Sequence, residues 1–372
     1  MLRYLLLILV AVTLASCAIT PASTGYRGGP ARTGYMGQAD ITGLPQPLWL
    51  HTTGDALFAA PAVADGRVYL GGSDGFLRCL DASTGELLWS YYTLDEINST
   101  PAVGLGMVFF GSWNGYVYGL DAATGEQVWR FRTEFLVDSS PLLLGRTLYI
   151  GSDDGHLYAL DAATGAVLWS YEAQAAVSSS PALAQNTIVF GSVDGHVYAL
   201  NAESGELAWQ HDTGEPVTGT PALADGVVYC KGAGKLRAIA PACACMADDL
   251  PPAQELWHSE VDFFSTAPAV HEGIVFAGSY DGGTMYALDA ATGEERWRFR
   301  TGGSIFSDPV ISGGTVCFGG KDGYLYALRA SDGEPVWRIP FAGGIEASPV
   351  VADGKLFVPA MDGTLYVYRL AR

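Results

Sequence analysis

Apolar residues along this chain come in short runs that are separated by turn residues. In the stretch 179–209, the run from Thr187 to Gly191 is β-branched and aromatic, and the run from His196 to Leu200 alternates. The Val-Asp-Gly between them is typical of a tight hairpin, because Asp-Gly tolerates a positive φ. With one apolar run before and one after, the pattern predicts four short strands. Outside the N-terminus no stretch has the i, i+3, i+4, i+7 spacing of a long amphipathic helix, so the sequence predicts an all-β protein.

This group of strands recurs about every forty residues. Most copies end in Asp-x-x-Thr-Gly-x-x-x-Trp, as from Asp161 to Trp169. The terminal tryptophans are Trp49, Trp89, Trp129, Trp169, Trp209, Trp257, Trp297 and Trp337. A small residue followed by proline marks the other end of each copy, at Pro61, Pro101, Pro141, Pro181, Pro221, Pro268, Pro309 and Pro349. Two markers that agree on eight copies indicate a repeat architecture.

Four strands per repeat and eight repeats predict an eight-bladed β-propeller of four-stranded antiparallel blades. We assign each proline to the first strand of its blade, which lines the central channel, because a missing N–H costs no ladder bond at an edge. We assign each tryptophan to the outermost strand. There it would cover the Thr-Gly turn and the small residue at the head of its motif, where one blade meets the next. The tryptophans are therefore predicted to be structural residues that dock the blades.

The two ends of the repeat region are predicted to close the ring together. After Trp337 the sequence holds only three further strands, around 348–351, 355–359 and 364–370. The missing outer strand would be Leu48 to Leu50, and its pairing with the C-terminal blade would remove an open edge. Residues 47–372 are therefore predicted to form a single propeller domain, which we expect to be monomeric.

The N-terminus has the features of an export signal. In residues 1–17 one basic residue, Arg3, precedes an apolar run that is too short to span a bilayer. Its end, Leu14 to Cys17, is similar to the lipobox of bacterial lipoproteins. That resemblance implies cleavage before Cys17 and lipidation of this cysteine, with enough acyl chains for stable anchoring. The alternative is an ordinary secretory signal with an incidental cysteine.

Residues 18–46 are rich in Gly, Pro and Thr and are predicted to be a flexible tether that wraps onto the ring. The protein would then be exported and anchored to the cell envelope by its lipid. In a cell with two membranes we expect it on the periplasmic side of the outer membrane. In a cell with one membrane we expect it on the outer face of the cytoplasmic membrane.

The formal net charge of −19 disfavours nucleic acid and anionic lipid surfaces as partners. It favours a basic protein surface or a cation. Acidic residues also gather in the loops that precede the first strands, together with Phe58, Phe135, Phe263, Phe264 and Phe306. The acidic members of this predicted partner-binding rim are Asp95, Glu96, Glu134, Asp138, Glu215, Asp262 and Glu346. The other interpretation of these loops is a solvated rim with its aromatic rings tucked between blades.

The fifth blade departs from the repeat. The segment 241–253 replaces the Asp-Ala-Ala-Thr-Gly turn and carries Cys243 and Cys245. A local disulfide between these two cysteines is one hypothesis for an oxidising compartment, and a metal site is another. Cys79 stands where other blades carry Ala or Gly, Cys230 where they carry Gly, and Cys317 at an apolar strand position. These three are therefore predicted to be packing residues.

No other residue type forms a convincing catalytic or metal site. His156 and His196 occupy equivalent positions in neighbouring blades, but a zinc site would need more ligands nearby. The Asp-Gly pairs recur with the repeat, so hairpin geometry explains them better than cation binding. No Ser/His/Asp arrangement or phosphate-binding loop is present. We expect no catalytic residue, cofactor or metal.

The repeat Asp-x-x-Thr-Gly-x-x-x-Trp, with Asp-Gly-x-Leu/Val-Tyr-Ala-Leu between copies, resembles the PQQ-type β-propeller repeat family over nearly all of residues 47–372. One branch of that family is the quinoprotein dehydrogenases, which bind pyrroloquinoline quinone and Ca²⁺. The other is the BamB-like lipoproteins of outer-membrane β-barrel assembly, which bind no quinone. The lipobox, the eight blades and the length are similar to the second branch.

The resemblance implies a lipid-anchored scaffold that binds partner proteins in the cell envelope. The enzyme branch carries a vicinal Cys-Cys pair and long insertions with Ca²⁺ ligands. This chain has Ala244 between Cys243 and Cys245, and its first four blades keep the forty-residue spacing. Two alternatives remain open: a quinoprotein dehydrogenase-like protein that uses quinone and Ca²⁺, and a cell-surface propeller that binds a ligand or carbohydrate.

Overall fold

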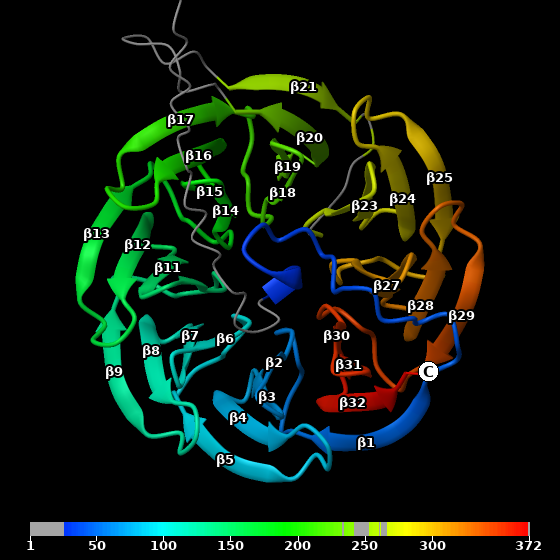
Figure 1. Cartoon of the computed structure of the whole chain (residues 1–372), viewed down its shortest axis with the longest axis horizontal. Coiled ribbons are helices and arrows are strands. Elements are labelled where there is room, and N and C mark those ends of the chain that lie inside the picture. Colours follow the sequence, from blue (N-terminus) through cyan, green and yellow to red (C-terminus); the bar gives the residue numbers. More distant parts are fainter. Residues whose placement is uncertain (1–25, 233, 242–252, 260, 262–265, 371–372) are drawn as a thin grey trace, which may run out of the picture.

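The computed structural model describes residues 26–232, 234–241, 253–259, 261 and 266–370. In this part of the chain, eight four-stranded antiparallel sheets stand around a central axis like the blades of a fan (Figure 1). Each blade runs outward from a three-residue inner strand to a longer outer strand. The predicted eight-bladed β-propeller is therefore confirmed.

The blades follow one another in chain order. The strands of blades one and two are β2 (Ala62–Ala64), β3 (Arg67–Gly71), β4 (Phe76–Asp81), β5 (Leu87–Tyr92), β6 (Ala102–Gly104), β7 (Met107–Ser112), β8 (Tyr116–Asp121) and β9 (Gln127–Arg132). Those of blades three and four are β10 (Leu142–Leu144), β11 (Thr147–Gly151), β12 (His156–Asp161), β13 (Val167–Glu172), β14 (Ala182–Ala184), β15 (Thr187–Gly191), β16 (His196–Asn201) and β17 (Leu207–Asp212).

The second half of the ring repeats this arrangement. The strands of blades five and six are β18 (Ala222–Ala224), β19 (Val227–Gly232), β20 (Lys235–Ala240), β21 (Gln254–His258), β22 (Ala269–His271), β23 (Ile274–Gly278), β24 (Thr284–Asp289) and β25 (Glu295–Arg300). Those of blades seven and eight are β26 (Val310–Ser312), β27 (Thr315–Gly319), β28 (Tyr324–Arg329), β29 (Pro335–Pro340), β30 (Val350–Ala352), β31 (Lys355–Pro359), β32 (Thr364–Arg369) and β1 (Gln46–Thr52).

The last blade combines the two ends of the chain, as predicted. β1 pairs antiparallel with β32, with Trp49 opposite Val367 and Thr52 opposite Thr364. The strand order is β1-β32-β31-β30, so β1 is the outermost strand of blade eight. This pairing gives β32 a partner on both sides, and an open edge in the middle of the ring is avoided.

The repeated prolines lie just outside the inner strands, not within them. Pro61 directly precedes β2 and Pro181 directly precedes β14, and the other six hold the same place. A proline has no N–H to give to a ladder, and it holds the residue before it in an extended conformation. The proline therefore restrains the backbone conformation just before the inner strand, and the strand pairing begins one residue later.

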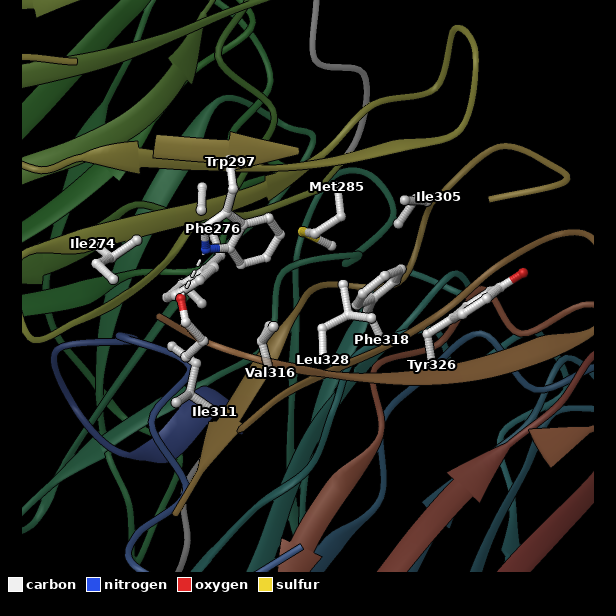
Figure 2. Close-up of a cluster of buried hydrophobic side chains, with 13 residues drawn as sticks. Ile274, Phe276, Met285, Trp297, Ile305, Ile311, Val316, Phe318, Tyr326 and Leu328 are labelled. Atoms are coloured by element: carbon white, nitrogen blue, oxygen red, sulfur yellow. Dashed lines mark hydrogen bonds between the residues drawn. The ribbon is translucent and has the colours of Figure 1, made fainter. Parts of the chain in front are cut away.

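The tryptophans pack across the boundary between blades. The indole of Trp129 lies over Gly165 in the turn of the next blade, where a Cβ would stand 2.6 Å from the ring. Its Nε1 donates a hydrogen bond to the carbonyl of Ala162 at 2.8 Å. Trp297 repeats this contact with Gly333 and Ala330, inside the apolar cluster of blades six and seven (Figure 2). Each of these two indoles thus joins two sheets by packing and by one hydrogen bond.

The segment 26–45 lies across the channel. It begins with a short 3-10 helix, η1 (Tyr26–Gly28), near the centre of the ring (Figure 1). Its carbonyls then accept hydrogen bonds from the inner strands of four successive blades, at the N–H groups of Leu183, Leu223, Val270 and Ile311. The part of the predicted tether that the structure describes is thus bonded to the ring in a fixed path.

The position predicted for Cys230 is wrong by one residue. Cys230 pairs with Arg237, as Phe190 pairs with Tyr198 in the blade before, so it takes a large apolar position. The position that is glycine in six other blades is held by Lys231, which is buried. The hairpin of blade five lacks the Asp-Gly pair by which most other repeats can be aligned. The one-residue error at Cys230 was therefore not visible in the sequence.

Candidate binding site at the channel mouth

A cavity of about 600 Å³ opens at one end of the channel. At this end the loops that connect successive blades lead into the inner strands. It is built from two rings of equivalent positions. The outer ring is the residue three before each proline: Phe58, Asn98, Asp138, Ser178, Thr218, Phe306 and Glu346. The inner ring is the residue just before each proline: Ala60, Thr100, Ser140, Ser180, Thr220, Ala267, Asp308 and Ser348. The repeat therefore places one side chain of every blade at the inner level and one of seven blades at the outer level; the residue three before Pro268 lies outside the described residues.

The inner ring is joined by hydrogen bonds that run from blade to blade. The backbone N–H of Thr100 donates to Ser140 Oγ at 3.0 Å, and that of Ser140 donates to Ser180 Oγ at 2.9 Å. The N–H of Asp308 donates to Ser348 Oγ at 3.2 Å. These bonds satisfy backbone groups that face the channel and hold the floor of the cavity rigid.

Blade seven carries a carboxylate at this level where three other blades have serine. Asp308 is buried, and its Oδ1 accepts the N–H of Ala267 at 2.6 Å. Its Oδ2 lies 3.5 Å from Nε of Arg27, whose Nη2 also donates to the carbonyls of Ala267 and Pro268. A buried carboxylate needs such a partner. The N-terminal segment thus supplies the charge that neutralises the floor of the cavity.

Arg32 ties the same segment to the opposite side of the channel. It is buried, and its guanidinium donates to the carbonyls of Pro181 at 3.1 Å and Pro141 at 2.9 Å. Both carbonyls belong to the repeated prolines. Two arginines of the N-terminal segment therefore bond to the entry points of blades three, four and six.

The wall formed by blades two to four is acidic. Glu96 accepts a hydrogen bond from Asn98 Nδ2 at 3.1 Å, and Asp138 accepts one from Trp113 Nε1 at 2.9 Å. Burial raises the pKa of Asp138, and the charges of Asp153 and Glu96 raise it further, while the bond from Trp113 opposes this. Burial also raises the pKa of Asp153. The negative charge of this wall is thus concentrated and partly desolvated.

The wall formed by blades seven, eight and one is aromatic. Phe58 and Phe306 face the cavity, and Tyr280 packs edge-on against Phe306 at 5.1 Å between ring centroids. Lys321 Nζ lies 4.5 Å from the centre of the Phe306 ring and 3.1 Å from Oε1 of Glu346. The carboxylate on this side is therefore neutralised by a neighbour.

The structure separates the predicted rim into two groups. Glu96, Asp138 and Glu346 line the cavity together with Phe58 and Phe306. The remaining described members lie on the same loops outside the cavity: Asp95, Glu134 and Glu215. Asp262, Phe263 and Phe264 lie outside the described residues.

Sequence reasoning missed two residues of the site. Trp113, the one tryptophan outside the repeat frame, lines the cavity, and so does Asp308. Asp308 was overlooked because a small residue was expected before each proline, although its departure from Ser, Thr and Ala was visible in the sequence. Lys231, which is buried next to the lining residue Gly219, was missed as well: burial lowers its pKa to about 8, although the charge of Asp308 opposes that shift.

The histidines and cysteines belong to local structure. Nδ1 of His156 and of His196 each lies 3.3 Å from the Asp of its own hairpin. Burial raises the pKa of Cys79 to about 11 and that of Cys230 to about 12. Cys17, Cys243 and Cys245 lie outside the described residues. Within residues 26–370, as far as they are described, no three His, Cys, Asp or Glu side chains are grouped to hold a metal ion. Nor does this part contain a helix long and apolar enough to cross a membrane.

A family model described as outer membrane protein assembly factor BamB matches the chain at residues 45–143, 114–243, 249–323 and 310–371. Together these matches cover almost the whole ring. No curated protein matches the sequence.

Several solved structures share the fold. BamB from Moraxella catarrhalis has 20% sequence identity and a TM-score of 0.74, covering 88% of this chain and 100% of that one. A europium-containing methanol dehydrogenase has 15% identity and a TM-score of 0.77, covering 93% and 97%. Quinohemoprotein alcohol dehydrogenase from Comamonas testosteroni has 17% identity and a TM-score of 0.77, covering 96% and 82%. At these identities the likeness extends to the fold alone.

Proposed function

Because this chain belongs to the family of outer membrane protein assembly factor BamB, we propose that it is a non-catalytic scaffold that binds partner proteins during assembly of outer-membrane β-barrel proteins. The observation that carries the proposal is the family match around the ring, from residue 45 to residue 371. The acidic and aromatic cavity at the channel mouth supports it, because a rigid concave surface of mixed character suits protein recognition.

The proposal includes attachment to the membrane through a lipid on Cys17. Release from the signal would leave residues 18–45 between Cys17 and the ring, and of these the segment 26–45 is bonded to the propeller. A Cys17→Ser variant should then move from the membrane fraction to the soluble periplasmic fraction. Retention of that variant in the membrane fraction would contradict lipid anchoring at Cys17.

The partner is tested by crosslinking in intact cells followed by capture of the tagged protein. We expect a barrel-assembly protein to be captured with the wild type. Charge reversal at Glu96 and Asp138 should reduce that capture, because both line the channel mouth. Asp95→Lys and Glu134→Lys are the matched controls, since they change the same charge on the same loops outside the cavity. Capture of no barrel-assembly protein by the wild type would overturn the assembly role.

The quinone enzyme remains the competing proposal, and the residues of the cavity do not fit it. An anionic quinone would face the carboxylates of Glu96 and Asp138, while Arg27 and Lys321 already pair with Asp308 and Glu346. A Ca²⁺ site needs six or more oxygens, and no such acidic group occurs among the described residues. Titration of the purified chain with pyrroloquinoline quinone and Ca²⁺ should therefore show no saturable binding. Titration with glycans tests the carbohydrate-binding alternative in the same way.

A further inference from the structure

The acidic wall of the cavity has carboxylates that no cation neutralises. Glu96 and Asp138, which line the cavity, take part in no ion pair among the described residues, and neither does Asp153, which is bonded to the lining residue Ser178. Their hydrogen bonds come from neutral donors, the side chains of Asn98, Trp113 and Ser178. Since like charges in a partly desolvated wall repel one another, this arrangement leaves room for one compensating cation.

The other two carboxylates of the cavity are already neutralised. Asp308 pairs with Arg27 at 3.5 Å, and Glu346 pairs with Lys321 at 3.1 Å. Of the four carboxylates that line the cavity, these two have a cation beside them, whereas Glu96 and Asp138 on the wall of blades two to four do not.

A second observation indicates what kind of group would bind there. The Oδ1 atom of Asn98 is buried and has no hydrogen-bond partner in the described part of the chain. A buried acceptor without a donor is costly, and native structures rarely keep one without a reason. Asn98 lines the cavity beside Glu96, and its Nδ2 is already used by that carboxylate. A ligand N–H group that reached this oxygen would satisfy it, so the acceptor without a donor beside Glu96 favours a ligand that carries several N–H groups.

The aromatic residues provide the apolar part of the site. Trp113, Phe58 and Phe306 line the same cavity as the carboxylates. An aromatic ring attracts a cation to its face and packs against an aliphatic stem. Hydrogen-bond acceptors on one wall and aromatic rings around the opening are complementary to a side chain with a cationic head group on an apolar stem.

We propose that the channel mouth binds the side chain of an arginine presented by a loop of the partner protein. This inference rests on the proposed scaffold function and deepens it by naming the ligand. Arginine fits better than lysine because its planar guanidinium carries five N–H donors, enough for Glu96, Asp138 and Asn98 together. The cavity of about 600 Å³ is of the size of a typical ligand site, and the N-terminal segment lies across the channel behind it.

The test uses the purified full-length chain in detergent and two tripeptides, acetyl-Gly-Arg-Gly-amide and acetyl-Gly-citrulline-Gly-amide. Citrulline has the shape of arginine without its charge. We expect the arginine peptide to bind at least ten times more tightly and to shift the indole N–H resonance of Trp113. The Glu96→Gln/Asp138→Asn variant should lose at least ten-fold in affinity. The Asp95→Asn/Glu134→Gln variant, changed on the same loops, should stay within two-fold of the wild type.

Equal binding of the two peptides, or an unchanged affinity in the Glu96→Gln/Asp138→Asn variant, would overturn the site. Spermidine is the third probe, and binding ten-fold tighter than the arginine peptide would assign the site to a free polyamine instead. Capture from cells separates this inference from the scaffold function. Loss of peptide binding with undiminished capture in the Glu96→Gln/Asp138→Asn variant would show that the partner docks elsewhere. Peptide binding without any captured partner would refute the scaffold function while leaving the arginine site in place.

Discussion

Trp129 shows what a single residue contributes to this molecule. A Cβ at Gly119 of its own blade would stand 2.4 Å from the indole, and one at Gly165 of the next blade would stand 2.6 Å from it. The two glycines thus let one large ring contact two sheets at once. Gly165 also has a φ of +72°, a conformation that glycine adopts readily because it has no Cβ. The strongest sequence signal of the chain is therefore a packing requirement.

Replacing Trp129 with alanine should destabilise the ring strongly. The change leaves a cavity at the boundary between blades two and three and removes the hydrogen bond to Ala162. We expect the free energy of unfolding to fall by ~3–5 kcal/mol, as for other large buried aromatic residues. Val128→Ala is the control: its side chain is 54% exposed, and we expect a change within about 0.5 kcal/mol. Urea denaturation measures both, and similar values for the two variants would contradict the packing role.

Asp138 should make stability depend on pH. Its pKa is raised in the folded state by burial and by neighbouring acids. The folded chain therefore holds this proton more tightly than the unfolded chain, and stability falls as pH rises through the interval between the two pKa values. Asp138→Asn stays neutral, so its stability relative to the wild type should increase across that interval and stay constant above it. Urea denaturation from pH 3 to pH 7 measures this difference, and a difference that does not vary with pH would refute the prediction.

At the scale of elements, the N-terminal segment acts as an additional structural element inside the channel. Its backbone bonds to inner strands β14, β18, β22 and β26, and Arg27 and Arg32 bond to carbonyls of the repeated prolines. These contacts link blades three to seven, five blades that are otherwise held only by their neighbours. The composition of the segment is that of a linker, yet its two arginines give it a defined place.

The contributions of Arg27 and Asp308 to the free energy of unfolding should depend on each other. Arg27→Ala removes the guanidinium that lies 3.5 Å from the buried carboxylate of Asp308, and we expect a loss of ~3–5 kcal/mol in the free energy of unfolding. Asp308→Ser restores the residue found in blades three, four and eight, but it leaves the guanidinium unpaired. The double variant removes both charges and should be more stable than Arg27→Ala alone. A double-mutant cycle measures the coupling, and purely additive effects would show that the pair is not a unit.

At the scale of the whole molecule, ring closure depends on a strand far from its partner in sequence. β1 and β32 are separated by almost the entire chain, and together they complete blade eight. In a ring built of neighbour contacts, one incomplete blade opens two interfaces. Trp49 strengthens this closure by donating a hydrogen bond from its indole to the carbonyl of Ala82 in blade one.

Removal of β1 should open the ring. A chain that lacks residues 1–52 would expose the edge of β32, and we expect its Tm to fall by ~10 °C or more with self-association through that edge. A chain that lacks residues 1–45 keeps β1 and is the matched control, with monomeric behaviour expected. Calorimetry and size-exclusion chromatography measure both. Equal Tm values with both chains monomeric would show that β1 is dispensable for closure.

The sequence by itself determined the architecture. The spacing of Trp and Pro, the hairpin residues and the single strand ahead of the first full repeat were enough to predict eight blades and their closure. These features act locally or between neighbouring repeats, so a period in the sequence translates directly into a period in space. The one register error, at Cys230, occurred where blade five loses its Asp-Gly hairpin.

Only the tertiary structure decided which polar residues act together. Eight loops up to almost three hundred residues apart line one cavity with residues such as Phe58, Asp138 and Glu346, while Asp95 and Glu134 lie outside it. The cavity residues stand at repeated places before the prolines, but only the assembled ring shows that these places face the channel mouth. Likewise, the pairing of Arg27 with Asp308 joins residues that no repeat relates. Long-range burial favours such pairs, because a buried charge costs free energy unless the fold brings it a partner.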